Sequence, residues 1–410
     1  MRILLLSNFY PPAGRGGFEE WCAEVLERLR VGGHDVRVLT SNFGVGTLGP
    51  DPAWVYRELF LEMDFAALRN AFQFFTDRKK REMENLACFR RHLEIFQPEA
   101  VMIWGMWNLE RSLACLAEEL MPDRVIYYMG DYWPSLPGQF REYWNMPARR
   151  WFSNLPKSLL RPLAQSVLER EKTPVPKLER VLFPSTFMRQ EFARLGFTPK
   201  VAEIIHGAID TGSYLQSRDY SRSRDYCSIL YVGRLSPEKG VHTAIEAMDY
   251  LVHRLDIHNV KLTIIGSGEH EYAEGLQQLV QDYEISGLVT FVPAQPKEKL
   301  PVIYREADIL IFPSIWAEPF GRVIVEGMAS GLAVVGTCVG GAAEMLVEGE
   351  TALTFSPEDA VGLAGQLKRM IESPALRRQL GEQSRRFAVS RFDIQAMTAG
   401  IEAQLKKMVN

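Results

Sequence analysis

Short runs of aliphatic residues alternate along the chain with longer segments in which apolar residues recur every three or four positions. The first run, Arg2–Ser7, predicts a buried strand, and Phe18–Arg30 predicts an amphipathic helix. A strand–helix–strand order of this kind is typical of parallel strands joined by right-handed crossovers. Further strands of this half are expected at Val36–Thr40, Ala100–Trp104, Val125–Met129, Arg180–Pro184 and Lys200–Ile205, with a helix at Glu82–Phe96.

A second alternation of the same kind begins at Cys227. Its strands are expected at Ile229–Val232, Val260–Ile265, Val289–Val292, Ile309–Phe312 and Ala333–Gly336, with helices at Val241–Leu251, Tyr272–Tyr283, Lys299–Arg305, Gly321–Ser330, Pro357–Glu372, Ala375–Phe387 and Ile394–Met408. The pattern predicts two α/β, Rossmann-like doubly wound domains that face each other across a cleft, where ligands commonly bind. We place them at residues 1–208 and 227–389, joined by a polar linker at 209–226.

Two segments of the first half do not follow the alternation. Pro52–Lys80 is aromatic and irregular, and Tyr132–Pro176 is interrupted by prolines. Within the latter, residues 148–163 combine basic and aromatic side chains, which is typical of peripheral contact with an anionic membrane. Pro156 and Pro162 argue against one long helix there, and an ordinary surface insertion is the competing interpretation.

Composition narrows the class of protein. The 410 residues are 47% hydrophobic, enough for two domain cores, and the net charge of −4 does not suggest a nucleic-acid partner. The five cysteines are scattered, and no motif indicates a metal site. The N-terminal apolar run is too short for a signal peptide, and no apolar stretch is long enough to span a bilayer. We therefore expect a cytoplasmic protein without a metal or other cofactor. The basic and aromatic residues at 148–163 add the expectation of peripheral contact with the inner membrane face.

The clearest candidate site is Glu318-Pro319-Phe320-Gly321, between the expected strand Ile309–Phe312 and the expected helix Gly321–Ser330. The N–H groups of Phe320 and Gly321 would lie at a helix N-terminus, which favours anions. A second carboxylate, Glu326, lies on an otherwise apolar helix face, so we expect it to have a dedicated partner and to face the cleft. These features predict a corner that binds a nucleotide sugar.

Two other strand ends would meet this corner. Arg234 and Lys239 follow the strand Ile229–Val232, and an Arg fork beside a Lys charge suits a diphosphate. Taken alone, they are better explained as solvated surface charges, and the diphosphate interpretation depends on the other features of the same sheet edge. Gly266-Ser267-Gly268 follows the strand Val260–Ile265, where glycines allow a ligand to approach the backbone, although glycines are also common in ordinary turns.

The first half offers two candidates at strand ends. Gly16-Gly17 opens the helix Phe18–Arg30 in the phosphate-loop position, and a plain turn is the alternative. Asp131 follows the strand Val125–Met129 and is the carboxylate of this half best placed to meet an acceptor hydroxyl. A turn-forming aspartate is the alternative interpretation for Asp131.

Together these residues resemble the retaining family 4 glycosyltransferases of the GT-B fold, over nearly the whole chain. The most specific match is the pair Glu318 and Glu326 around Glu-Pro-Phe-Gly. The next is Gly-Arg-Leu-x-x-x-Lys-Gly at 233–240, and weaker matches are Gly16-Gly17, Gly266-x-Gly268, residues 206–210 and residues 340–344. The resemblance implies that residues 390–410 form a closing helix that crosses back to the first domain.

By this resemblance, Arg234 and Lys239 would hold the donor diphosphate, Glu326 the ribose and Glu318 the donor sugar, with Phe320 and Gly321 nearby and Val292 beside the base. The family often has a His before the aspartate, as in His-Asp-Tyr-Trp-Pro, whereas this chain has Gly130-Asp131-Tyr132-Trp133-Pro134. The missing imidazole leaves open whether Asp131 or another group handles the acceptor proton.

The sequence thus predicts a glycosyltransferase that moves a sugar from a nucleotide-diphosphate sugar to a hydroxyl of a carbohydrate, lipid-linked or small-molecule acceptor. One alternative is a nucleotide-sugar epimerase or hydrolase of the same fold, which would act on the donor without an acceptor. The other is a non-catalytic homologue that binds the nucleotide sugar.

Overall fold

A computed structural model describes residues 1–14, 16–65, 70–147, 151–215 and 225–409, and within the segment 151–156 it describes the backbone alone. The chain divides into two compact units. Unit 1 comprises Met1–Phe183, Arg189–Ile205 and the residues from Thr398 onward, and unit 2 comprises Pro184–Met188 and His206–Met397. Each unit has its own parallel sheet.

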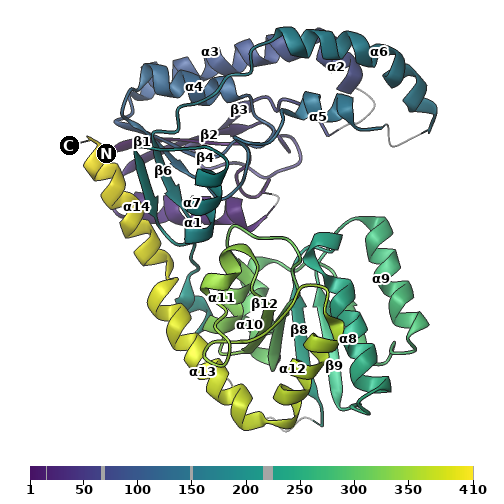
Figure 1. Ribbon diagram of the computed structural model, residues 1–410. Helices are drawn as coiled ribbons and strands as arrows, with labels where there is room; N and C mark the ends of the chain where they lie inside the picture. Colours follow the sequence, from purple (N-terminus) through teal and green to yellow (C-terminus); the bar gives the residue numbers. More distant parts are fainter. Residues whose placement is uncertain (15, 66–69, 148–150, 216–224, 410) are drawn as a thin grey trace. The chain divides into compact units, whose positions relative to one another are not determined.

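Unit 1 is built on a seven-stranded sheet in the order β3-β2-β1-β4-β5-β6-β7 (Figure 1). All recorded pairings between these strands are parallel. The chain runs from β1 outward to β3 and then returns to continue at β4, so the topological switch point lies between β1 and β4. The strands are β1 (Arg2–Ser7), β2 (Asp35–Ser41), β3 (Val55–Leu59), β4 (Ala100–Gly105), β5 (Val125–Tyr128), β6 (Arg180–Phe183) and β7 (Val201–Ile204).

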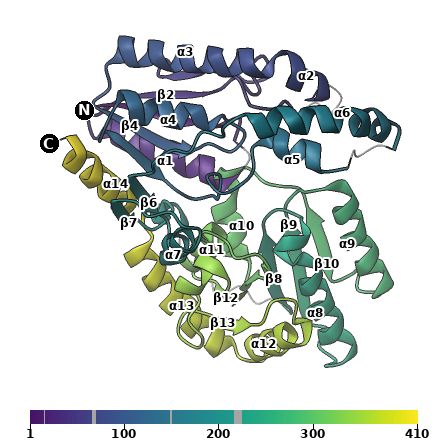
Figure 2. The ribbon, with the colours of Figure 1, turned by 45° about the horizontal axis from the view of Figure 1, so that its top comes forward.

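Helices cover both faces of the sheet in unit 1. Figures 1 and 2 show α3 and α4 on one face and α1 on the other. The apolar side of α1 is buried through Trp21, Val25 and Leu29, as the helical spacing predicts. The helices are α1 (Gly17–Val31), α2 (Asn70–Thr76), α3 (Arg78–Phe96), α4 (Arg111–Leu120), α5 (Gln139–Asn145), α6 (Trp151–Arg170) and α7 (Thr186–Arg194), the last of which begins in unit 2.

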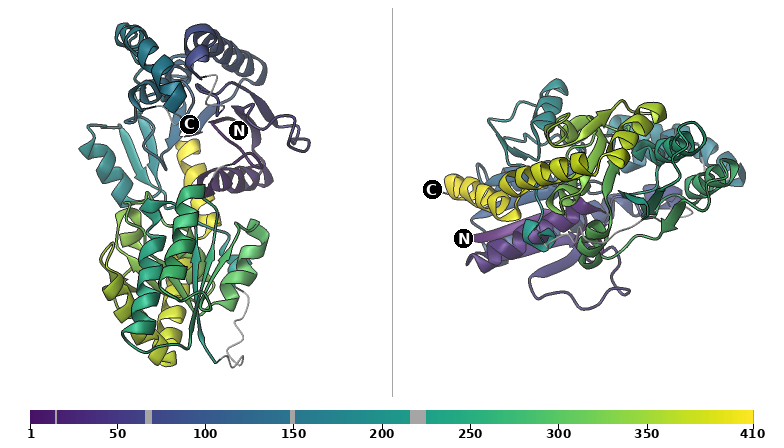
Figure 3. Two further views of the ribbon diagram at one scale, coloured as in Figure 1. Left: turned by 90° about the vertical axis from the view of Figure 1, so that its right-hand side faces the viewer. Right: turned by 90° about the horizontal axis from the view of Figure 1, so that it is seen from below.

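Unit 2 repeats the design with six strands in the order β10-β9-β8-β11-β12-β13, and its switch point lies between β8 and β11. The strands are β8 (Cys227–Val232), β9 (Val260–Ile265), β10 (Val289–Val292), β11 (Ile309–Phe312), β12 (Ala333–Thr337) and β13 (Leu353–Phe355). The left view of Figure 3 shows helices on both sides of this sheet. They are α8 (Val241–His253), α9 (His270–Asp282), α10 (Leu300–Glu306), α11 (Arg322–Ala329), α12 (Ala360–Glu372) and α13 (Pro374–Arg391).

The boundary between the units differs from the expected linker at 209–226. Residues 216–224 of that segment lie outside the described part of the chain, but residues 209–215 belong to unit 2. Ile209 and Tyr214 are buried there, and the chain at Ile209 forms a parallel bridge with Asp393. Burial of these side chains explains why a segment that looks polar overall starts the second unit. The last helix, α14 (Ile394–Val409), begins in unit 2 and clusters with unit 1 from Thr398 onward.

The two irregular segments of the sequence form two additions to unit 1, the first at Pro52–Lys80 and the second at Tyr132–Pro176. Pro52–Lys80 contains β3 and α2, and Tyr132–Pro176 contains α5 and α6. The expectation that Pro156 and Pro162 prevent one long helix was wrong, because α6 runs through both. Tertiary packing outweighs the lost hydrogen bonds: α6 buries Ala164 in a small core whose other buried members are Phe74, Phe140 and Trp144.

Candidate functional site

The clearest group of chemical side chains in unit 2 lies at the switch point of its sheet. The loop after β8 carries Lys239, and the loop after β11 carries Glu318. The Lys239 Nζ lies 2.7 Å from Glu318 Oε1, and both side chains are about 85% buried, with 14% and 15% of their surface exposed. Lys239 also lies over the Trp316 ring, 5.5 Å from its centroid. The sequence-predicted pair of loops is therefore brought together around one largely buried ion pair.

Backbone contacts fix this arrangement. The N–H groups of Ile315 and Trp316 donate to the carbonyl of Glu238, at 2.9 and 3.2 Å. Gly240 has φ +65°, and a Cβ there would lie 2.0 Å from the Pro313 carbonyl oxygen, so this position requires glycine on two grounds. The loop after β8 is thus bound directly to the loop after β11, which holds Lys239 and Glu318 in register.

The loop after β12 supports Glu318 from another side. The Gly341 N–H donates to the Glu318 carbonyl at 2.7 Å, and a Cβ at Gly340 or Gly341 would lie 2.4 Å from a carbonyl oxygen of residues 318–319. Ser185 donates its hydroxyl to the Pro319 carbonyl at 2.6 Å. The Gly-Gly-Ala-Ala-Glu motif at 340–344 therefore acts as a platform beneath the Glu318 loop.

Gly266 and Gly268 lie in close contact with the loop after β8, and their approach to a ligand stays a prediction. A Cβ at either position would lie 1.8 Å from a backbone oxygen of the loop after β8, that of Gly233 or that of Leu235. The Leu235 N–H donates to the Ser267 carbonyl at 3.1 Å. The close neighbour that requires glycine here is the adjacent loop, because the two backbones are in contact. These glycines position Arg234 and its loop.

The remaining predicted residues of unit 2 lie around the same sheet edge. Arg234 is 62% exposed on its side chain, 3.6 Å from Glu238, and so is open to a ligand. Phe320 is buried, and Gly321 is the residue before the first turn of α11. Val292 ends β10, and its carbonyl accepts from the Gly266 N–H at 3.0 Å.

Glu326 is the most buried carboxylate of the predicted set, with 3% of its surface exposed. Its Oε2 accepts from the Tyr304 hydroxyl at 2.9 Å, and its Oε1 accepts from Arg322 Nε at 3.0 Å. The dedicated partner expected from the apolar helix is thus present. Both oxygens have a partner inside unit 2, and the orientation of Glu326 toward a cleft stays a prediction. Each carboxylate oxygen accepts more than one hydrogen bond, so these two partners leave acceptor capacity for the hydroxyls of a ribose.

We expect Glu326→Ala to lower the free energy of unfolding by about 3 kcal/mol, because it removes a buried acceptor to which both the Arg322 guanidinium and the Tyr304 hydroxyl donate. Urea unfolding followed by circular dichroism measures this loss. The matched control is Glu372→Ala, which removes an exposed i,i+4 partner of Lys368 and should change stability by less than about 0.5 kcal/mol. Equal effects of the two substitutions would contradict the buried role of Glu326.

The predicted residues of unit 1 also gather at its switch point. Gly16 precedes α1 and Gly17 is its first residue, and Asp131 follows β5. The Trp133 N–H donates to Asp131 Oδ1 at 3.3 Å, so Asp131 does form the turn that was the alternative interpretation. Burial raises the pKa of Asp131 to about 7, the Trp133 N–H opposes this rise, and the charge of Glu19 adds to it. Glu19, in the first turn of α1, was not among the predicted residues, because no local pattern links it to Asp131.

Phe18, a second residue of α1, explains why position 130 is a glycine. A Cβ at position 130 would lie 2.2 Å from Cε2 of the Phe18 ring, which is too close for any side chain. Phe18 is held there by Trp104 and Tyr128, whose ring centroids lie 5.5 and 6.3 Å from its own. The space next to Gly130 is therefore filled by an aromatic ring from α1, where the resemblance led us to expect an imidazole.

Gly130→Ala should destabilise unit 1 by about 1–3 kcal/mol, because the added methyl group must displace the Phe18 ring from its stack. Thermal unfolding by calorimetry reports this loss. Gly49→Ala is the control, since no heavy atom lies within 4 Å of a Cβ at that position. In the double variant Gly130→Ala/Phe18→Leu the cost of the glycine substitution should shrink, and a full additive loss would show that Phe18 is not the obstacle.

One further cluster of possible metal ligands lies in unit 1. Among the described residues, Glu58, Cys88 and His92 bring their ligand atoms within 4.8 Å of one another. Arg91 forms an ion pair with Glu58, and Arg37 lies 3.5 Å from His92 Nδ1. Two guanidinium groups already provide positive charge at this cluster, and we interpret it as an ion-pair network. That the protein works without a metal stays a prediction.

Comparison with known proteins places the chain in a family. Residues 15–213 match the family model described as Glycosyltransferase Family 4, and residues 216–387 match the model described as Glycosyl transferases group 1. Glycogen synthase of Mycobacterium tuberculosis strain H37Rv is 30% identical over 237 residues, 57% of this chain and 56% of that protein. D-inositol 3-phosphate glycosyltransferase of Acidothermus cellulolyticus is 31% identical over 207 residues, 48% of this chain and 46% of that protein. These matches thus span about half the length of the curated relatives.

Solved structures extend the likeness to the whole fold. Sucrose-phosphate synthase from Thermosynechococcus elongatus has a TM-score of 0.73 at 20% identity, covering 99% of this chain and 98% of that one. HepE of Anabaena, solved in complex with UDP and glucose, has a TM-score of 0.70 at 19% identity, covering 99% of both chains. The chain therefore belongs to the glycosyltransferases of the group 1 and family 4 type, and its two parallel-sheet units have the GT-B fold.

Proposed function

We propose that this protein is a retaining glycosyltransferase that moves a sugar from a nucleotide-diphosphate sugar to an acceptor hydroxyl. The observation that carries the proposal is the Lys239–Glu318 ion pair, 2.7 Å long and largely buried at the switch point of unit 2. Ligands of open α/β sheets bind at such switch points, outside the carboxyl ends of the strands. The UDP and glucose bound to the Anabaena protein support a donor of this class.

In the proposed reaction, Lys239 and the exposed Arg234 bind the diphosphate and stabilise the negative charge that grows as it leaves. Glu318 accepts hydrogen bonds from hydroxyls of the donor sugar. The ion pair between Glu318 and Lys239 couples binding of the sugar to binding of the diphosphate, because it fixes the carboxylate beside the diphosphate site. A guanidinium and an ammonium group supply the positive charge that a metal ion provides in other transferases, so we assign no step to a metal.

Asp131 is our candidate for the group that accepts the acceptor proton. Burial raises its pKa to about 7, so the carboxylate is basic enough to take a proton and is still substantially ionised near neutral pH. Position 130 has no side chain, and the Phe18 ring fills the space beside it. Of residues 130 and 131, Asp131 is therefore the one with a titratable group. Retention would follow from attack on the face that the diphosphate leaves.

Product analysis with UDP-, GDP- and ADP-sugars tests the proposal. Each donor is incubated with a mixture of acceptor sugars, and NMR identifies the anomeric configuration of the product. We expect one donor to give a product with the donor's configuration, and addition of EDTA to leave the rate unchanged. An inverted product, or donor that is hydrolysed or epimerised at the same rate without acceptor, would contradict the proposal. Absence of both transfer and binding across the panel would also overturn it.

We also propose peripheral contact with a membrane through α6. Residues 148–150 and the side chains of 151–156 lie outside the described part of the chain, but Leu159, Leu160 and Leu163 are 73%, 39% and 57% exposed beside Arg161. Exposed leucines next to a cation suit an anionic lipid surface. None of the helices in the described ranges is long and apolar enough to cross a membrane. Flotation with phosphatidylglycerol vesicles should be lost in Leu159→Ser/Leu163→Ser, and equal flotation of both proteins would refute the contact.

A further inference from the structure

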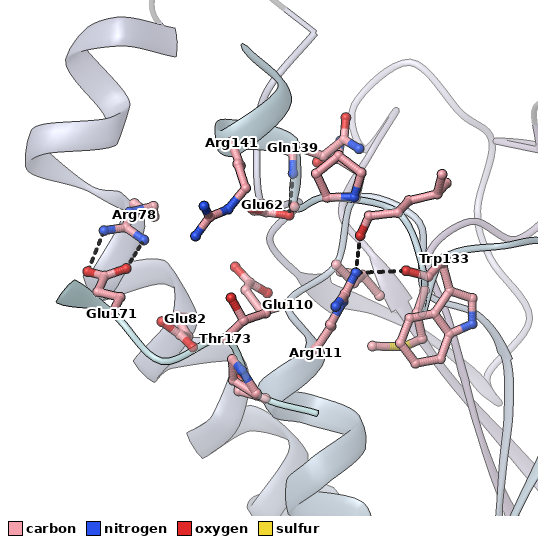
Figure 4. Close-up of a pocket in the computed structure, with 18 of the residues that line it drawn as sticks. Glu62, Arg78, Glu82, Glu110, Arg111, Trp133, Gln139, Arg141, Glu171 and Thr173 are labelled. Carbon is pink, nitrogen blue, oxygen red and sulfur yellow. Dashed lines mark hydrogen bonds and ion pairs between the residues drawn. The ribbon is translucent and has the colours of Figure 1, made fainter. Parts of the chain in front are cut away.

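A pocket of about 150 Å³ lies in unit 1, between the two additions that the sequence left without a role. Figure 4 shows its lining, with Glu62 and Arg78 from the first addition and Gln139, Arg141 and Glu171 from the second. A single water needs only about 10–15 Å³ on this measure, so the space is large enough for a small ligand. Residues of α3, α4, α5 and α6, together with the loops after β3 and β4, thus jointly enclose a ligand-sized space.

The pocket adjoins the candidate base through a short chain of contacts. The Arg111 guanidinium, in the lining, donates to the Trp133 carbonyl at 3.0 Å. Trp133 also lines the pocket, and its backbone N–H donates to Asp131 Oδ1 at 3.3 Å. Figure 4 shows Arg111 and Trp133 linked at one side of the space. A ligand in the pocket would therefore lie next to the turn that carries Asp131.

The charges of the pocket are nearly balanced. Its lining includes five lysine or arginine residues and four glutamates. At one side, Arg78 and Glu171 form a two-pronged ion pair at 2.6 and 2.7 Å, which leaves little excess charge there. Burial lowers the pKa of Arg111, while the charge of Glu62 acts against this decrease. A lining of this kind offers many donors and acceptors without a strong preference for an anion.

Figure 4 shows Glu110 and Arg141 extending into the pocket, with no ion pair drawn between these two side chains. Glu110 Oε2 accepts from Asn85 at 2.9 Å, whereas its Oε1 is buried without a hydrogen-bond partner among the described residues. Arg141 donates to the Leu168 carbonyl at 3.1 Å. A buried acceptor without a donor is costly, and a ligand hydroxyl would satisfy it. A carboxylate and a guanidinium across one space suit the adjacent hydroxyls of a sugar ring.

We infer that this pocket binds a neutral sugar residue of the acceptor, with Glu110 accepting and Arg141 donating hydrogen bonds to its hydroxyls. Trp107 and Trp133 add flat apolar surface to the lining. The inference rests on the proposed function, because it identifies the acceptor of that reaction as a carbohydrate. It also assigns the two additions of unit 1 to acceptor recognition.

Saturation-transfer NMR on the full-length protein tests this assignment, with UDP, GDP or ADP present at saturation. The probes are methyl glycosides of glucose, galactose and mannose, with glucuronate and glucose 6-phosphate as anionic comparisons. Glu110→Gln, which keeps the shape of the side chain, and Arg141→Met should each weaken binding of the neutral glycoside at least tenfold. Glu119→Gln and Arg170→Met, both exposed, should leave it unchanged.

The outcomes separate this inference from the proposed function. Nucleotide binding measured by calorimetry should be the same in all four variants, because the pocket lies in unit 1 and the nucleotide residues lie in unit 2. If nucleotide binds and no neutral glycoside does, or if only the anionic sugars bind, the inference is wrong while the proposed function stands. Retained glycoside binding in both Glu110→Gln and Arg141→Met would also overturn it. If no nucleotide binds to the wild type, the proposed function fails first.

Discussion

Lys239→Ala should reduce sugar transfer at least about a thousandfold while leaving the protein folded. The Nζ of Lys239 forms the 2.7 Å ion pair with Glu318, and we assign it to the diphosphate of the donor. Its loss removes positive charge where negative charge grows, so the chemical step should slow and nucleotide affinity should fall. Glu318→Ala should cause a comparable loss of rate, because it removes the carboxylate assigned to the donor sugar. Turnover with radiolabelled donor measures both rates.

The control for this pair of substitutions is Lys368→Ala. Lys368 lies on α12 in the same unit, where it forms an exposed ion pair with Glu372. Its removal should leave the rate unchanged. The two site variants should differ in one respect: Glu318→Ala should retain more of the nucleoside-diphosphate affinity than Lys239→Ala. Near-normal turnover of either variant would show that the site is misassigned.

Asp131→Asn should abolish most transfer without weakening donor binding, because the amide cannot accept a proton. In the wild type, kcat/KM should rise with pH through about 7, the raised pKa of Asp131, and level off above it, since the base acts only when ionised. Below that pH the protonated carboxyl has no capacity to take the acceptor proton. Initial rates between pH 5.5 and 8.5, with nucleotide binding checked by calorimetry, test both statements.

Glu19→Gln provides the matched variant for this pH profile. The charge of Glu19 contributes to the raised pKa of Asp131, after burial. Without that charge the rise in kcat/KM should shift to lower pH. Glu20→Gln, a half-buried neighbour in the same helix turn, should leave the profile in place. A rise that stays unchanged in Glu19→Gln and in Asp131→Asn would assign the ionisation to a different group.

Most of the strand and helix positions could be predicted from the sequence because local periodicity and burial point the same way. β1 (Arg2–Ser7), β9 (Val260–Ile265) and β11 (Ile309–Phe312) lie where their apolar runs predict. The sequence did not predict α6 as one continuous helix, because Pro156 and Pro162 locally disfavour a helix. Packing of Ala164, Val167 and Leu168 against the core around Trp144 stabilises that helix, and such contacts have no local signature.

The candidate site shows the same division. The order of strands and loops puts Arg234, Lys239 and Glu318 at one sheet edge, which the sequence predicts from parallel topology alone. It does not predict that Gly266 serves the neighbouring loop, since the 1.8 Å approach to Gly233 is a property of two backbones in space. Nor does it predict that Arg322 and Tyr304 donate to the two oxygens of Glu326, a partnership that joins α10 to α11.

The sequence by itself thus determined the two doubly wound units and the residue types at their carboxyl edges, because alternation and strand–loop order are local properties. Tertiary structure alone decided which side chains lie beside position 130 and Asp131. The Phe18 ring stands where a side chain at position 130 would be, and Glu19 acts on the pKa of Asp131 from a different element. Long-range packing brings these pairs together across more than a hundred residues of sequence, and steric exclusion and desolvation then set the chemistry of the site.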